Sequence, residues 1–100
     1  MIITINSYVQ EKFKPNEMFK FLRLLGQCIE QEMKFLFVDV LFCIGKTNGN
    51  VQNKKIEVLI HDPPLQLYGK NNKRRFENIS REIIQNNFSG EIIFKYYKEI

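Results

Sequence analysis

The chain has 100 residues, of which 44% are hydrophobic and 26% are charged. This composition is typical of a single globular domain and excludes a disordered chain. Its apolar runs are all shorter than the roughly 20 residues that a membrane-spanning helix needs, so we expect no membrane contact. The formal net charge is +4, which favours a polyanionic partner.

Two cysteines, Cys28 and Cys43, stand in apolar patterns. They are too few and too scattered for a disulfide framework or a zinc site, so we expect reduced thiols in the core. The chain has no alanine, although alanine is the best helix former. An A/T-rich genome explains this absence better than physics does. Organelles, phages and low-GC bacteria all have such genomes. We find no signal peptide and no imported presequence, so we expect that a protein working in an organelle would be made there.

The first half of the chain predicts a strand and a helix. Alternation of Ile3 and Ile5 predicts a strand over Ile2–Ser7. Pro15 and Asn16 mark a helix start, and we expect this helix over Asn16–Glu32. Its apolar stripe has spacings of three and four residues and consists of Met18, Leu22, Leu25, Ile29 and Met33.

The middle of the chain predicts a hairpin of two strands. The aromatic and β-branched run Lys34–Ile44 predicts the first of them, and the run Lys55–His61 predicts the second. Between them lies a polar segment that contains Asn48-Gly49, a strong hairpin signal. We therefore expect an extended hairpin with its tip at about 45–55. Pro63-Pro64 ends the second strand.

The remaining residues predict a helix and a last strand. Phe76, Ile79 and Ile83 form the apolar stripe of this helix, with Phe88 as a further candidate. The run 91–100 predicts the last strand. The order strand-helix-strand-strand-helix-strand predicts one ferredoxin-like α+β domain over residues 1–100, with a four-stranded antiparallel sheet and two helices on one face. This fold serves many functions and decides none.

His61 is the only histidine, and it is followed by Asp62. Neighbours on a strand point to opposite faces, so they make a poor base and orienting carboxylate. Cys43 and Ser80 are possible nucleophiles, but no pattern positions them, and we assign Asp39 to a wet strand face. We therefore predict no enzymatic activity, no small-molecule substrate, no cofactor and no metal, and a packing or RNA-contacting role for His61.

Basic residues form two groups that are interspersed with asparagines. One group flanks the expected hairpin tip, and the other lies at the start of the second expected helix. Lysine and arginine neutralise phosphates, and amides add hydrogen bonds to sugars and bases. Solvated surface is the alternative. The RNA-binding residues that we predict are Lys46, Lys54, Lys55, His61, Lys70, Lys73, Arg74 and Arg75.

Three short pieces resemble one known family. Ile3-Thr4-Ile5-Asn6-Ser7-Tyr8 is similar to the opening strand of the small-subunit ribosomal protein S-ten family. Asn53-Lys54-Lys55 resembles that family's hairpin tip, and Ile56-Glu57-Val58, followed after two residues by His61, resembles its next strand. The ending 89–97 has a similar layout. The chain differs at Leu59-Ile60, where the family has Arg-Thr before the histidine.

This resemblance implies a structural constituent of the small ribosomal subunit. Its partners would be the rRNA of the subunit head and neighbouring head proteins, with the hairpin lying along the RNA. Its location would be a mitochondrial ribosome, for an organelle-encoded chain, or the cytoplasm of an A/T-rich bacterium. The alternative is a ferredoxin-like assembly subunit of another, non-ribosomal complex, held by protein–protein contacts.

Overall fold

A computed structural model describes residues 1–8, 15–36, 39–48 and 53–98. The predicted order of strands and helices is confirmed, with two short 3-10 helices added. The elements are β1 (Ile2–Tyr8), α1 (Pro15–Glu32), η1 (Met33–Leu36), β2 (Leu41–Asn48), β3 (Lys55–His61), η2 (Leu65–Tyr68), α2 (Lys70–Gln85) and β4 (Glu91–Tyr97). Within the described residues, no helix is long and apolar enough to cross a membrane.

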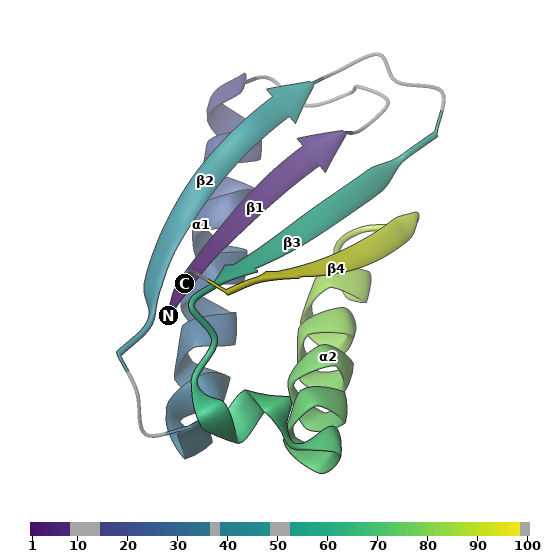
Figure 1. The fold of residues 1–100 in the computed structure, drawn as a ribbon. Coiled ribbons are helices and arrows are strands. Elements are labelled where there is room, and N and C mark those ends of the chain that lie inside the picture. The colour runs from purple at the N-terminus through teal and green to yellow at the C-terminus, as the bar shows by residue number, and fades with distance from the viewer. Residues whose placement is uncertain (9–14, 37–38, 49–52, 99–100) are drawn as a thin grey trace.

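The four strands form one mixed sheet in the order β2-β1-β3-β4. β1 runs parallel to β2, and β3 runs parallel to β4, whereas the central pair β1 and β3 is antiparallel. The chain is therefore two successive β-α-β units joined along their first strands. In Figure 1 the sheet lies in front, α1 passes behind β1 and β2, and α2 lies beside β3 and β4.

The prediction of a ferredoxin-like antiparallel sheet is wrong. In that fold another strand lies between the two strands of each β-α-β unit. Here each helix returns the chain to the position next to the preceding strand, so the two strands of a unit are parallel neighbours. The prediction of an extended hairpin is wrong as well, because β1 lies between β2 and β3. Gly49 of the predicted Asn48-Gly49 turn lies outside the described residues, and Asn48 is the last residue of β2.

The predicted second strand begins too early. Met33 and Leu36 are both fully buried, three residues apart, in the 3-10 helix η1 that extends α1. Phe37 lies outside the described residues. Asp39 is exposed and precedes β2 instead of standing within a strand. β2 starts at Leu41, so it includes residues that we had predicted for the hairpin tip.

The helical stripes are close to those predicted. In α1, Leu22, Leu25 and Ile29 are buried, while Met18 lies outside the residues whose side chains are described. In α2, the buried residues are Phe76, Ser80 and Ile84, at spacings of four. The predicted members Ile79 and Ile83 are partly buried beside this stripe, and Phe88 follows the helix.

The core lies between the helices and one face of the sheet. The central strands β1 and β3 supply alternate residues to it: Ile3, Ile5, Ile56, Val58 and Ile60 are all fully buried. Since successive side chains on a strand point to opposite faces, the residues between them lie on the other face of the sheet. No helix of the described residues covers that second face (Figure 1), which we call the uncovered face.

Candidate nucleic-acid interface

One face of α2 forms an open, mostly basic groove of about 400 Å³. Its residues recur at helical spacings of three and four, which places them along one side of the helix. We call it the α2 groove, and it is lined by Lys70, Lys73, Arg74, Glu77, Asn78 and Arg81. Four cations thus face one carboxylate, so the groove suits an anion.

The start of α2 adds backbone donors to this charge. Gly69 precedes the helix and offers no side-chain cap, and the first turn contains no acidic residue. The first intrahelical bond runs from the Lys73 N–H to the Gly69 carbonyl, so the three preceding amides have no acceptor within the helix. Lys70 and Lys73 oppose the helix dipole here, and an anion would relieve that repulsion.

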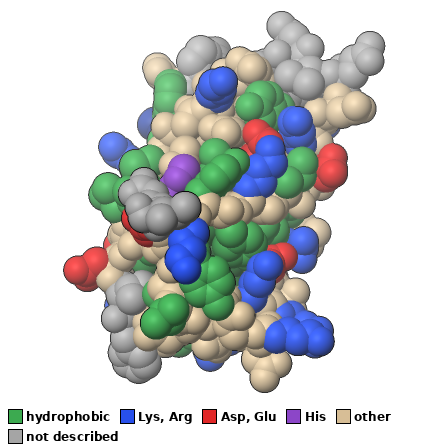
Figure 2. Space-filling model, in the orientation of Figure 1, with side chains coloured by type: hydrophobic (Ala, Val, Ile, Leu, Met, Phe, Trp, Pro, Cys, Tyr) green, Lys and Arg blue, Asp and Glu red, His purple; other side chains and the backbone are tan. Residues whose placement is uncertain are grey.

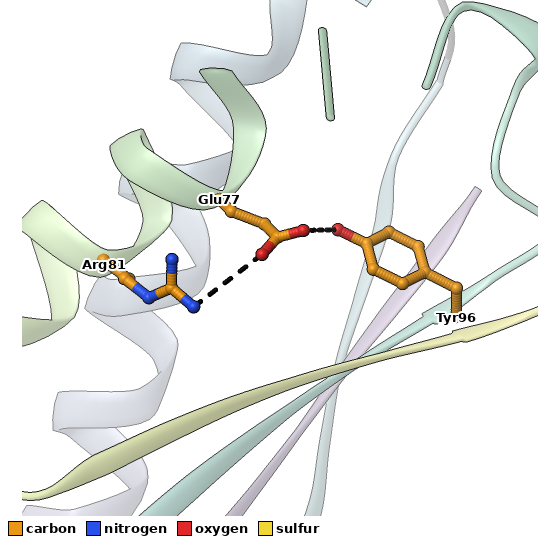
Figure 3. Close-up of polar contacts among 3 residues, drawn as sticks. All are labelled: Glu77, Arg81 and Tyr96. Carbon is orange, nitrogen blue, oxygen red and sulfur yellow. Dashed lines mark hydrogen bonds and ion pairs between the residues drawn. The ribbon is translucent and has the colours of Figure 1, made fainter. Parts of the chain in front are cut away.

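The single carboxylate of the α2 groove is already engaged. Figure 3 shows Glu77 between two partners. It accepts a hydrogen bond from the Tyr96 hydroxyl at 2.7 Å, and it lies 3.7 Å from the Arg81 guanidinium. Burial, followed by this contact with Glu77, raises the pKa of the Tyr96 hydroxyl, so Tyr96 remains a donor. Glu77 therefore opposes an incoming anion less than a free carboxylate would.

Aromatic rings hold several of the predicted RNA-binding cations. The Lys73 ammonium lies 4.5 Å from the Tyr96 ring centre, and the Lys55 ammonium lies 4.9 Å from that of Tyr8. The Arg75 guanidinium lies 4.0 Å from the ring centre of Phe35 in η1. Such contacts orient a cation without neutralising it. Arg75 thus ties α2 to η1 and does not line the groove.

The two predicted basic groups lie at opposite ends of the sheet. Lys55 pairs with Glu91 at one end of β3, and Lys46 and Lys54 are exposed at that same end. The six residue steps of β3 span about 20 Å before the chain turns towards α2. The structure therefore brings Lys70, Lys73 and Arg74 together and leaves the other group apart.

His61 lies at the α2 end of β3, on the uncovered face. Its ring stacks on Tyr97 of β4, with ring centres 5.2 Å apart and planes 16° apart. Asp62 takes a left-handed backbone conformation (φ 51°), and its N–H donates to the Tyr97 carbonyl. The predicted packing role of His61 fits this stack. In the described part of the chain, no three potential metal ligands cluster.

An ion pair with one buried and one exposed partner also lies on the uncovered face. Glu57 is only 7% exposed, and the Lys95 ammonium donates a hydrogen bond to it at 2.9 Å. This bond is the main cause that lowers the Glu57 pKa, with smaller effects from Tyr8 and Asn6, and it raises the pKa of Lys95. Burial and Glu57 raise the pKa of Tyr8. Both partners are held in their charged forms, which suits structure better than proton transfer.

A glycine makes room for Asn6 beside this pair. The Asn6 side-chain oxygen accepts a hydrogen bond from the Lys46 N–H at 2.8 Å, where the register of β1 and β2 shifts. A Cβ at Gly45 would lie 2.1 Å from that oxygen, so only glycine fits there. Lys46 is thus positioned by its backbone, while its side chain is exposed.

Sequence reasoning missed some residues and misplaced others. Arg81 and Asn78 line the α2 groove, and the available signal was that they follow Lys73 and Lys70, respectively, by eight residues. Cys28 is exposed on α1, so its predicted place in the core is wrong, while both cysteines are free as predicted.

No protein-family model and no curated protein matches the sequence. Two solved structures are similar in fold. Pt0534, crystallised after inactivation by 2-oxo-3-pentynoate, aligns with a TM-score of 0.63 and 8% identity over 99% of this chain and 86% of its own. RhCC from Rhodococcus jostii RHA1 aligns with a TM-score of 0.49 and 13% identity over 98% of this chain and 78% of its own.

The likeness to Pt0534 shows a shared fold, with the mixed sheet β2-β1-β3-β4 in place of the predicted ferredoxin-like antiparallel sheet. A protein that a small molecule inactivates has an activity to lose. Pt0534 therefore has an activity and shares this fold, and the fold alone does not support our prediction that the chain is not an enzyme.

Proposed function

We propose that this chain is an RNA-binding protein whose phosphate site is the α2 groove. The observation that carries the proposal is the gathering of four cations around one engaged carboxylate, at a helix start without acidic residues. From Lys70 to Arg81 the helix rises about 16 Å. A basic surface of that length exceeds a single phosphate group and suits a polyanion.

Salt dependence of binding tests this proposal. Each phosphate contact that is lost should lower the slope of log affinity against log salt by about 0.7 to 0.9. We expect Arg74→Gln and Lys70→Gln to lower the slope and weaken binding of RNA in general. Lys20→Gln, on the exposed face of α1, is the matched control and should leave the slope unchanged. Equal slopes in all three variants would refute the groove as the site.

The finer proposal is a structural role in the small ribosomal subunit. It rests on the sequence resemblance to the S-ten family and on the basic groove, although the fold that accompanied that resemblance is not the one observed. Sedimentation of the native protein through a gradient tests it. We expect co-sedimentation with small subunits that high salt or ribonuclease abolishes. Sedimentation elsewhere, unaffected by ribonuclease, would refute the ribosomal role.

A second candidate function is enzymatic, and the likeness to Pt0534 favours it. If this chain shares such an activity, 2-oxo-3-pentynoate should add covalently to one residue, and intact-protein mass spectrometry would reveal the adduct. Cys28 is exposed and free, so it is a nucleophile that could react without any active site. The test therefore includes Cys28→Ser. An adduct that disappears in this variant would argue against a dedicated site.

A further inference from the structure

The stacked rings of His61 and Tyr97 end one row of the uncovered face. The strand register places Leu41, Ile2, His61 and Tyr97 side by side across the four strands. Exposed apolar surface increases at both ends of this row, with Leu41 60% exposed, Ile2 38% and Tyr97 44%. In Figure 2, which views this face, hydrophobic side chains lie near the middle with lysines and arginines around them.

Within the described residues, one side of the Tyr97 ring has no stacked neighbour. β4 is the edge strand, and His61 of β3 lies against the inner side of the Tyr97 ring with nearly parallel planes. No strand of the described sheet lies beyond β4. The exposed area of Tyr97 therefore belongs to its outer side and its rim. A flat ring placed there would extend the existing stack by one member.

Two lysines lie close to Tyr97 in the sequence, Lys95 and Lys98. Lys95 is two residues before Tyr97 on the same face, where it pairs with Glu57, and Lys98 follows Tyr97 with its ammonium 5.6 Å from the Tyr68 ring centre. Lys73 of the α2 groove lies over Tyr96, the residue directly before Tyr97. Tyr96 and Tyr97 point to opposite faces of the edge strand β4, so an RNA strand that reaches both the groove and the ring would pass around this edge of the sheet. Asp62 is the exposed carboxylate nearby in sequence.

We propose that Tyr97 is a stacking site for one base of a single-stranded RNA whose phosphates lie in the α2 groove, an inference that rests on the RNA-binding function proposed above. Every base has a flat face, so stacking tolerates any sequence. The bases of a duplex are stacked on one another and paired, so a duplex would gain only the phosphate contacts. The site therefore selects single strands over duplexes.

A fluorescent variant reports stacking directly. The chain has no tryptophan, so Tyr97→Trp introduces the sole one. We expect a single-stranded oligonucleotide of mixed sequence to quench its emission. A duplex of the same sequence and a strand of the same length without bases should bind through their phosphates and leave the emission unchanged. Equal quenching by the strand without bases would overturn the stacking site.

Affinity variants test the same site without a label. Loss of a base stacked on an aromatic side chain weakens binding by roughly 5- to 150-fold. We expect a loss in this range for Tyr97→Leu and wild-type affinity for Tyr97→Phe, which keeps the ring. The matched control is Phe19→Leu, because Phe19 is 48% exposed and shares a shallow pocket with Lys20 and Arg23 on the other helix. This control should bind as the wild type does.

The outcomes separate the two proposals. If RNA binds with a salt dependence that requires Arg74, but Tyr97→Leu binds as tightly as the wild type, the stacking site is refuted and the phosphate groove stands. If no RNA binds in a salt-dependent manner, both proposals fail. If Tyr97→Phe loses as much affinity as Tyr97→Leu, the hydroxyl and not the ring makes the contact, which also refutes stacking.

Discussion

The two β-α-β units share an architecture and differ in charge. Each unit pairs its strands in parallel and covers them with one helix. α1 carries two cations and three carboxylates, whereas α2 carries five cations and two carboxylates. Both helices pack on the same sheet, yet only α2 has an excess of positive charge. Packing on the sheet therefore does not require this charge. The extra cations of α2 are therefore available for the RNA binding that we propose.

The units also differ in how helix and sheet are joined. In the first unit, Gly26 of α1 lets the Phe42 ring of β2 approach the helix backbone. In the second unit, Phe76 meets Phe94 edge to face, and Glu77 accepts a hydrogen bond from Tyr96. The first contact depends on shape alone, while the second combines apolar packing with polar bonds that sit under the basic groove.

The largest expected effect removes the main packing contact of the second unit. Phe76 is fully buried, and its ring centre lies 6.1 Å from that of Phe94. Phe76→Ala should lower the free energy of unfolding by about 3–5 kcal/mol, because it removes a buried ring and leaves a cavity. Urea denaturation measures this, with Phe19→Ala on the exposed side of α1 as control. A loss below about 1 kcal/mol would contradict the packing of α2 on the sheet.

The close approach in the first unit is tested by adding one methyl group. A Cβ at Gly26 would lie 2.2 Å from the Phe42 ring, so the ring must move. Gly26→Ala should cost about 1–3 kcal/mol by overpacking, even though alanine favours helices. Combining it with Phe42→Leu should recover part of this loss. If Gly26→Ala alone stabilises the protein in a thermal melt, α1 and β2 lie farther apart than described.

The ion pair on the uncovered face predicts a pH dependence. The pKa of Glu57 is lowered in the folded state, chiefly by Lys95, so its contribution is present above the pKa of the unfolded state and disappears as the pH falls through the folded pKa. Glu57→Gln should therefore cost on the order of 1–3 kcal/mol at neutral pH. The difference between variant and wild type should begin to shrink as the pH falls below the ordinary glutamate pKa of about 4.3, and should vanish only below the lower pKa of the folded state. Urea denaturation at a series of pH values measures the free energy of unfolding of both proteins. If the lowered pKa does not belong to Glu57, the difference between variant and wild type should stay constant across this range.

The smallest effects separate two adjacent arginines of α2. Arg75 lies on the Phe35 ring, so Arg75→Gln should lower the free energy of unfolding by about 0.5–1 kcal/mol and leave the salt dependence of RNA binding nearly unchanged. Arg74 lines the groove, so Arg74→Gln should change stability by less than about 0.5 kcal/mol and lower the salt slope. If Arg75→Gln lowered the salt slope and Arg74→Gln lowered the free energy of unfolding, Arg75 would be the phosphate contact and Arg74 the packing residue.

Patterns that depend on local period were predicted correctly. Ile3 and Ile5 are buried as their alternation indicates, and Leu22, Leu25 and Ile29 are buried as helical spacing indicates. These positions follow from the geometry of a single strand or helix. The predicted boundary near Met33, between the first helix and the second strand, was wrong because an aromatic run fits a strand and a 3-10 turn equally well.

The pairing of strands was not predictable in the same way. Asn48-Gly49 favours a hairpin by local propensity, yet β1 separates β2 from β3. Which strands become neighbours depends on the helix crossovers and on the core as a whole. The cations of α2 were visible in the sequence, but their division between a ring and a groove, as for Arg75 and Arg74, depends on tertiary contacts with η1.

The parallel pairing within each unit has a consequence for the speed of folding. Lys55 and Glu91 pair across 36 residues, Ile2 and Leu41 across 39, and Ile2 and His61 across 59. No neighbouring strands of the described sheet form a local hairpin. Each pair of strands must therefore close a long loop, which costs chain entropy, before its hydrogen bonds can form. Such a high contact order belongs to slow two-state folders, and we expect refolding in milliseconds to seconds.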